Sequence, residues 1–385
     1  MFGELPKLFD RDFTIGYFLP VACFLAALHG LFSVFDQAAL PNFLTKADTE
    51  AKLLVGATIL GLLTWLLSVL LLAVNRTLYR FFEGYHWPSR GWCTGFGDGA
   101  KWLERQRYEA LWNRTNGNTE EQALFTGSGK QVPPELIREQ AELDRYMAER
   151  FPDRKEYVLP TALGNTIRAF ERYPTVVYGV DTIEGWSRLV AVIPKDYRAL
   201  IDSAKSQTDL WLNFCFLSWL VIPFYMWMAI DNHKLCAPYI PALALVAAYL
   251  SYGWTIAAAR EWGSLFKSAF DVYLPDLLGK LRFAKPPDAD AERQMWQDFS
   301  QVIIYRAQAK LPPRIWPQES GSSKSPEPVE PAEPEETGEE AEPKAENPEK
   351  TVRPEAAELA ETGEEKEPPA ERPDEAVHPE EAEPT

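Results

Sequence analysis

Four long hydrophobic runs without a formal charge constrain the fold of this chain more than any other feature of its sequence. They cover residues 14–35, 53–74, 210–230 and 235–259. Each has the roughly 20 residues that a helix needs to cross about 30 Å of hydrocarbon. None shows the polar face that a helix in the core of a soluble protein would carry. The runs therefore predict an all-α integral membrane protein with four transmembrane helices.

The basic residues that flank these runs predict the orientation. With both termini inside, ten lie on inner flanks and three in outer loops. The inner set is Lys7, Arg11, Arg76, Arg80, Arg90, Lys195, Arg198, Lys205, Arg260 and Lys267, and the outer set is Lys46, Lys52 and Lys234. Cytoplasmic flanks carry the excess of Lys and Arg, so we expect an N-in, C-in protein of the cell membrane. The alternative for the first run, a cleaved signal peptide, is disfavoured because the run exceeds a typical apolar signal core.

This orientation divides the rest of the chain into six segments. They are a cytoplasmic N-terminus, an outer loop, a helical cytoplasmic domain, a second outer loop, further cytoplasmic helices and a tail, at residues 1–13, 36–52, 75–209, 231–234, 260–317 and 318–385. The last segment holds 23 acidic residues, six basic residues and 12 prolines, and its surplus of negative charge equals the −17 of the whole chain. Such a composition cannot bury enough apolar surface to offset chain entropy. We therefore expect a disordered acidic tail on a neutral body that lacks the basic patch of a nucleic-acid-binding protein.

Glycine and proline divide the segments outside the spans into helices and loops. The second span is expected to continue to Glu83 and to break at Gly84 and Pro88. A glycine-rich loop and a tryptophan-bearing helix should follow, then a mobile loop, at 91–99, 102–112 and 113–134. The tryptophan-bearing helix either lies on the lipid surface or packs on its neighbours. Further helices are expected at 134–150, after Pro160, at 180–193, from 194 into the third span, from 260 to 275 and after Asp288 or Asp290.

Two series of small residues have the spacing of close helix contacts. They are Ala22, Ala26 and Gly30 in the first span, and Ala247, Ser251, Thr255 and Ala259 in the fourth. Small residues allow helix backbones to approach and gain van der Waals contact that lipid does not supply. The ridges predict packing within the four-helix bundle or, alternatively, self-association into a homo-oligomer.

Motifs that would name a reaction are incomplete. The segment Thr126-Gly-Ser-Gly-Lys130 has Leu124 where a phosphate-binding loop needs its first glycine, and Gln131 where that loop needs Ser or Thr. The four cysteines contain no CxxC pair, and His29 has no acidic partner within the spans. We therefore expect no cofactor, no metal and no catalytic set.

The densest polar motif runs from Leu159-Pro-Thr-Ala-Leu-Gly-Asn165 through Tyr178-Gly-Val-Asp181 and Trp186-Ser-Arg-Leu189 to Pro194. It resembles a segment that precedes a transmembrane pair in a group of uncharacterised bacterial multi-pass membrane proteins. The resemblance covers about 40 residues and the span layout, implies no activity and points to a bacterial inner membrane. We expect structural roles, with a turn and cap at Gly179 and Asp181, and with Arg168 and Arg188 either at headgroups or paired with Glu171 and Asp181. The alternative is a polar surface or binding groove formed by Asn165, Arg168, Glu171, Asp181 and Arg188.

Three functions remain open at this point. The first is a non-enzymatic membrane scaffold or adaptor that offers its helical domain or tail to a cytoplasmic protein. The second is an oligomeric pore or membrane-perturbing effector, which would need the polar span residues to face a channel. The third is a membrane enzyme that acts on a lipid-linked substrate near Asn165, Arg168, Asp181 and Arg188.

Overall fold

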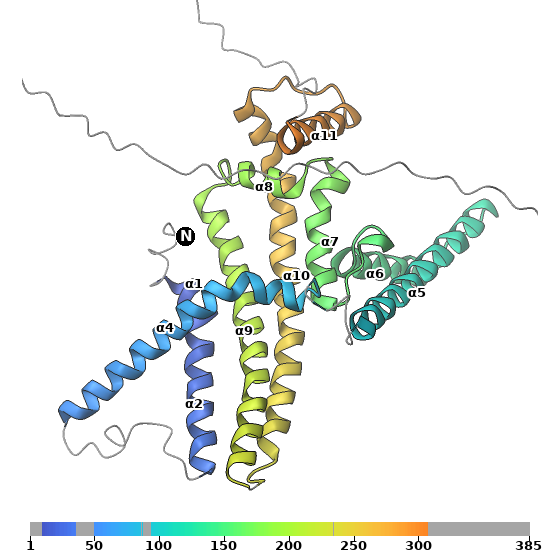
Figure 1. Cartoon of the computed structure of the whole chain (residues 1–385). Helices are drawn as coiled ribbons and strands as arrows, with labels where there is room; N and C mark the ends of the chain where they lie inside the picture. The colour runs from blue at the N-terminus through green and yellow to red at the C-terminus, as the bar shows by residue number, and fades with distance from the viewer. Residues whose placement is uncertain (1–9, 36–49, 86, 88–93, 234, 307–385) are drawn as a thin grey trace, which may run out of the picture. The chain divides into compact units, whose positions relative to one another are not determined.

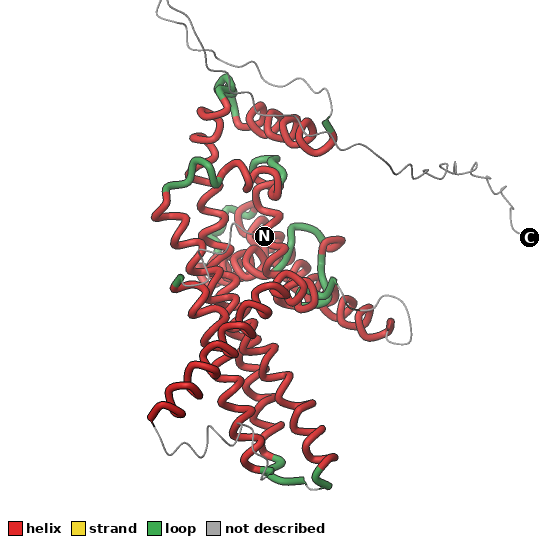
Figure 2. Tube along the Cα trace, turned by 60° about the vertical axis from the view of Figure 1, so that its left-hand side comes forward, coloured by secondary structure: helices red, strands yellow, loops and turns green. Residues whose placement is uncertain are grey.

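The computed structural model describes residues 10–35, 50–85, 87, 94–233 and 235–306. In these ranges the regular structure is helical, and none of them contains a strand (Figure 1, Figure 2). The predicted all-α class is therefore confirmed for this part of the chain. The predicted tail at 318–385, the N-terminal residues 1–9 and residues 36–49 of the outer loop lie outside the described residues.

Four helical segments are long and apolar enough to cross a membrane, as the charge-free runs predict. They are Arg11–Val34, made of α1 (Arg11–Phe13), the π-helix η2 (Thr14–Phe18) and α2 (Leu19–Val34), then α4 (Glu50–Phe82), α9 (Lys195–Asp231) and α10 (Tyr239–Leu281). The last two contain 37 and 43 residues, so they reach about 55 and 65 Å at 1.5 Å per residue. Both therefore continue well beyond the hydrocarbon layer, and α9 begins directly after Pro194 as expected.

Helix α10 also passes the proline at which we expected it to end. Pro275 lies inside the helix, which continues to Leu281. A proline removes a single N–H donor from the ladder. Leu274 and Leu277, on either side of it, are buried in the core. Their packing keeps the helix continuous where local sequence alone predicted its end.

The fourth span, α10, runs beside α9 (Figure 1), and three of its four ridge residues are buried. Ser251, Thr255 and Ala259 are buried as predicted, whereas Ala247 is exposed and Ala248 is buried instead. A spacing of four residues drifts around a helix with 3.6 residues per turn, so the ridge leaves the contact face at its first member.

The first-span ridge does not pack within the described chain. Ala26 and Gly30 are exposed and Ala22 is half-buried. A Cβ added to Gly30 would meet nothing within 4 Å. Within the described residues, Ala26 and Gly30 therefore do not pack against another helix of the same chain, and self-association remains as a prediction.

Helix α5 (Thr94–Gly127) corrects two predicted loops. Its 34 residues run unbroken through residues 94–99 of the expected glycine-rich loop and 113–127 of the expected mobile loop. Each glycine costs a helix about 1 kcal/mol relative to alanine, but contacts along its length offset that cost. Tyr108 is buried against Phe151, and Arg114 lies 2.6 Å from Glu139 of α6 (Pro134–Arg150). Helix α6 has the predicted bounds.

The main hydrophobic core lies where α7 (Ala162–Val177), α8 (Thr182–Leu189), α10 and α11 (Ala289–Tyr305) meet. Trp296 and Phe270 are fully buried there, together with Val180 and Leu189. In the expected helix at 180–193, Ile183 is three residues after Val180 and should share its buried face, but Ile183 is 79% exposed. The reason is that α8 begins at Thr182, so Val180 precedes the helix and helical spacing does not connect the two positions. Asp288 caps α11 by accepting from the amide of Ala291 at 2.8 Å.

Candidate functional site

A buried carboxylate, Asp209 of α9, joins the ends of three spans. It accepts from Tyr17 Oη at 3.0 Å, from Tyr79 Oη at 2.8 Å and from Asn75 Nδ2 at 3.2 Å. Lys205, one turn earlier on α9, adds an ion pair of 2.8 Å. Asn75 also donates to Tyr17 Oη at 2.7 Å. We call these five residues the span-end cluster.

The π-helix η2 and a glycine bring the first span close to α9. Asn213 Nδ2 donates to the carbonyl oxygen of Gly16 at 2.8 Å, and Ser206 Oγ donates to the carbonyl oxygen of Asp12 at 2.9 Å. A Cβ on Gly16 would lie 3.3 Å from Ser206 Oγ, so the two helices approach each other closely at this glycine. Single-turn π segments are frequent at functional sites. Here the carbonyl oxygens of Gly16, within η2, and of Asp12, just before it, accept hydrogen bonds from side chains of α9.

The hydrogen bonding of the span-end cluster indicates a structural role. An ionised carboxylate offers about four acceptor positions, and four donors occupy those of Asp209. A carboxylate with all positions filled has no position left for a metal ion or a substrate hydroxyl. Unpaired burial of such a charge would cost several kcal/mol. The cluster therefore holds the first, second and third spans together at one end.

The predicted polar surface divides into separate local structures. Asn165, fully buried at the start of α7, accepts from the amide of Leu159 at 2.6 Å and donates to its carbonyl oxygen at 3.2 Å. Its Nδ2 also donates to Glu104 Oε2 of α5 at 3.1 Å. All these partners belong to the protein, so Asn165 closes the loop before α7 and attaches it to α5.

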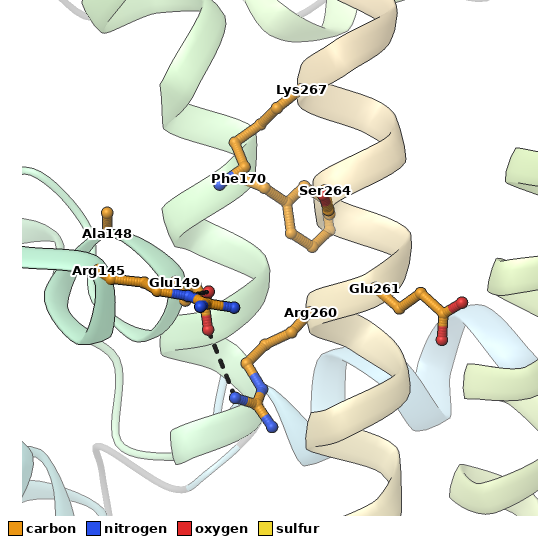
Figure 3. Close-up of a pocket in the computed structure, with 9 residues that line it drawn as sticks. Arg145, Ala148, Glu149, Phe170, Arg260, Glu261, Ser264 and Lys267 are labelled. Atoms are coloured by element: carbon orange, nitrogen blue, oxygen red, sulfur yellow. Dashed lines mark hydrogen bonds and ion pairs between the residues drawn. The ribbon is translucent and has the colours of Figure 1, made fainter. Parts of the chain in front are cut away.

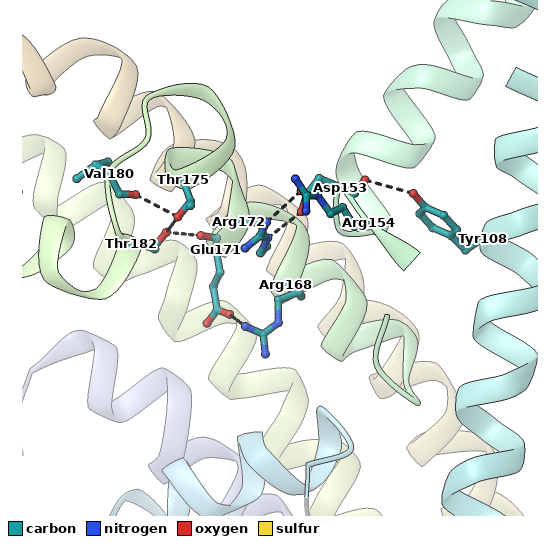
Figure 4. A network of polar contacts seen from close by, with 9 residues as sticks. All are labelled: Tyr108, Asp153, Arg154, Arg168, Glu171, Arg172, Thr175, Val180 and Thr182. Carbon is teal, nitrogen blue, oxygen red and sulfur yellow. Dashed lines mark hydrogen bonds and ion pairs between the residues drawn. The ribbon is translucent and has the colours of Figure 1, made fainter. Parts of the chain in front are cut away.

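Arg168 and Glu171, both half-buried on α7, form the second part (Figure 4). Their side chains are paired at 3.7 Å, and Arg168 also contacts the hydroxyl of Tyr85. Burial, followed by the nearby Glu171 carboxylate, raises the pKa of Glu83 from 4.5 to about 7, against the opposing effect of Arg168. Burial also raises the pKa of Glu171. The sequence indicated the Arg168–Glu171 pair but not the carboxylate of Glu83.

Close backbone contact explains why Glu83 lies beside this pair. A Cβ on Gly164 would collide with the carbonyl oxygen of Glu83 and lie 3.1 Å from its carbon. Gly84, with φ +91°, approaches Pro160 so closely that a Cβ would lie 2.9 Å from its Cδ. Two glycines therefore permit the end of α4 to rest on the start of α7. We call this contact the α4–α7 joint.

Asp181 and Arg188 belong to a third local structure. Asp181 caps α8 by accepting from the amides of Ile183 and Glu184 at 3.1 and 3.0 Å, which matches the predicted cap. Arg188 pairs with Glu184 at 2.8 Å, so of the two options for this side chain the one that pairs it with Asp181 is wrong. An i,i+4 pair on one helix face is geometrically easier, and the Asp181 side chain already serves the helix end. The five predicted residues thus share two helices without forming one groove.

The remaining motifs behave as isolated side chains. Lys130 is exposed beyond the end of α5, and His29 is exposed on α2 rather than packed. Among the described residues no group of three His, Cys, Asp or Glu side chains has the arrangement to hold a metal ion. Comparisons with protein families, with characterised proteins and with solved structures found no match to this chain. The resemblance noted in the sequence therefore stays a prediction.

Proposed function

We propose that this protein is a non-enzymatic membrane scaffold or adaptor that recruits a cytoplasmic protein to the bacterial inner membrane, with both termini inside. One observation carries the proposal. The start of α5 leaves three large apolar side chains uncovered in the described chain, with Phe96, Trp102 and Leu103 exposed by 69%, 60% and 53%. Clustered apolar side chains on a surface commonly mark an interaction site. We call these three residues the α5 face.

The composition around the α5 face favours a protein partner over lipid. Buried tryptophans are frequent energetic centres of protein interfaces, and charged side chains commonly surround them. Arg107 and Gln106 are exposed beside the face. Trp112, also exposed at 47%, lies about 180° around the helix from Leu103 and about 80° from Trp102, so the exposed apolar side chains spread over more than half of the helix circumference. A helix lying in the membrane surface would place its apolar residues on one side.

The body that carries this face is attached firmly to the spans. The α4–α7 joint connects α7, which lies outside the spans, to the end of the second span, and the span-end cluster holds that span to the first and third. Asn165 links that joint to α5 through Glu104, which also pairs with Arg107 at 2.5 Å. A partner bound at α5 would therefore be held at a defined place relative to the bilayer, which is what a scaffold requires.

The alternative of a pore has less support. The polar span residues that would line it lie inside the chain: Thr64, Ser68, Asn213 and Ser251 are buried and Ser218 is half-buried. The hydroxyls of Thr64 and Ser68 donate to carbonyl oxygens of their own helix at 2.7 and 2.6 Å. Oligomerisation would thus bring together apolar surfaces, and a water-filled channel needs polar ones.

Photo-crosslinking in native membranes tests the proposal. A photoreactive phenylalanine at Trp102 or Leu103 should give one discrete adduct with another protein. The matched control is Asn116, exposed further along the same helix, which should give none. Adducts with lipid alone, or with a second copy of the chain, would contradict recruitment. Ion conductance of the purified protein in a planar bilayer would favour the pore.

A further inference from the structure

A basic cavity opens between α6, α7 and α10 (Figure 3). Its volume is about 330 Å³, and Arg145, Arg260 and Lys267 contribute to its wall. Glu149 shares its carboxylate between two of them, at 2.7 Å from Arg145 Nε and 3.4 Å from Arg260 Nη1. Glu261 also belongs to the wall, but Figure 3 shows its carboxylate pointing to the other side of α10. Three positive charges therefore face one negative charge.

The surplus charge resides in groups with free hydrogen-bond donors. Within the described chain Lys267 has no carboxylate within 4 Å, and its ammonium lies 5.7 Å above the ring of Tyr173. Arg260 Nε is buried and has no hydrogen-bond partner there. Buried donors are normally satisfied. An anion in the cavity would satisfy this one and balance the charge.

One wall of the cavity is apolar, and the two helices that form it are in close contact. Gly263 of α10 lies against Phe170 of α7, where a Cβ would come within 2.8 Å of the ring carbon Cγ. Phe170 is itself buried against Trp262 and Phe266, at centroid distances of 5.0 and 5.5 Å. Ser264 adds a hydroxyl to the wall. The volume of the cavity is at the lower end of the range for ligand sites, about 300–1,000 Å³. A small charged headgroup fits such a space.

The position of the cavity along α10 indicates its depth relative to the hydrocarbon layer of the membrane. From Tyr239 to Ala259 the helix is uncharged, and this stretch spans about 30 Å, the thickness of the hydrocarbon layer. Arg260 to Lys267 cover roughly the next 10 Å, where lipid headgroups lie. Basic pockets between helices at this level are known to bind anionic headgroups.

We propose that this cavity binds a phosphate-bearing anion, held by Arg260 and Lys267 with Arg145 at the entrance. The same chemistry is offered by the headgroup of an anionic phospholipid and by a soluble phosphate compound. Its depth favours the lipid. Arg145 and Arg260 would shift part of their pairing from Glu149 to the phosphate oxygens, and Lys267 would gain its first anionic partner.

Ligand-dependent melting of the full chain in neutral detergent tests the site. Short-chain phosphatidylglycerol should raise the melting temperature at concentrations roughly tenfold or more below those of short-chain phosphatidylcholine, since one hydrogen-bonded charge contact is worth about that factor. Lys267→Gln should weaken the effect of phosphatidylglycerol by a similar factor. This variant breaks no ion pair, so it should fold normally, and Arg260→Gln serves as the second variant.

The matched control is Lys280→Gln, which removes an exposed charge from the same helix outside the cavity and should leave lipid binding unchanged. Inorganic phosphate, at ionic strength matched with chloride, identifies the source. Stabilisation by phosphate that depends on Lys267 would support the site and assign it to a soluble ligand. Equal effects of the two lipids with no effect of phosphate, or equal losses in Lys267→Gln and Lys280→Gln, would overturn the proposal.

Discussion

Replacing Gly164 by alanine should destabilise the protein by acting on the α4–α7 joint. The added Cβ would overlap the carbonyl oxygen of Glu83 and lie 2.9 Å from Thr161 Oγ1. The nearest atoms are backbone, so the end of α4 must move rather than a side chain rotate. Overpacking of this kind costs about 1–3 kcal/mol, and we expect the upper half of that range.

A helical glycine that has no close contact with another part of the chain serves as the control. Gly117 lies within α5, and a Cβ there would meet nothing within 4 Å. Gly117→Ala should therefore stabilise its helix by up to about 1 kcal/mol. At about 2–4 °C per kcal/mol, thermal unfolding in detergent should separate the two variants by roughly 5–15 °C. If Gly164→Ala melted at or above the wild type, the close contact and its structural account of the LPTALGN motif would be refuted.

Three further predictions use the same purified protein or intact cells. Asp209→Asn should lower the free energy of unfolding by about 2–4 kcal/mol, because it disrupts a buried carboxylate whose acceptor positions are filled. Lys205→Gln should lower it by less than about 1 kcal/mol, because the Lys205 side chain is 41% exposed. Equal losses of melting temperature in the two variants would contradict this. The folded-state pKa of Glu83 is raised from 4.5 to about 7, so the folded protein binds the extra proton and loses stability as pH rises through that window. The stability of Glu83→Gln should therefore match that of the wild type at pH near 4 and exceed it by about 1–2 kcal/mol at pH near 8, after allowance for solvent screening, and a gap that is absent or widest at low pH would contradict it. In cells whose native thiols are replaced, a membrane-impermeant reagent should label Asn42→Cys and spare Lys130→Cys; the reverse pattern would invert the orientation.

Much of the fold follows from the sequence because its signals are strong and local. A run of apolar residues without charges leaves a helix in lipid as the stable option, and the four runs became four helices. The sequence predicted caps at Asp181 and at either Asp288 or Asp290 from their positions before helical segments, and Asp181 and Asp288 accept amide hydrogen bonds there. These features depend on neighbours in sequence, so the sequence alone predicts them.

The predictions that were wrong concern features that depend on contacts between distant parts of the sequence. Glycines at 95, 97 and 99 predicted a loop because local propensity disfavours helix, but α5 gains contacts to α6 and to Phe151 that local reasoning does not include. Ile183 failed because the start of α8 was placed too early. The small-residue ridges failed in part because helix rotation depends on partners, and spacing alone does not define which face a partner covers. Each error lies where tertiary contacts decide between locally similar options.

The membrane topology predicts the level of the span-end cluster and of the basic cavity, but not the partners of their charged residues. A chain that crosses a bilayer four times brings the start of its first and third spans and the end of its second and fourth spans to the same side. Tyr17, Asn75, Asp209 and Arg260 occupy those four ends, so their common level follows from the layout. Their partners depend on helix rotation, which the structure supplies. Asp209 faces donors that fill its acceptor positions, whereas Arg260 shares one carboxylate with a second arginine and retains an unpartnered donor. A saturated charge stabilises the bundle, and an unsaturated one is available to a ligand, so the same membrane face holds both the span-end cluster and the proposed anion site.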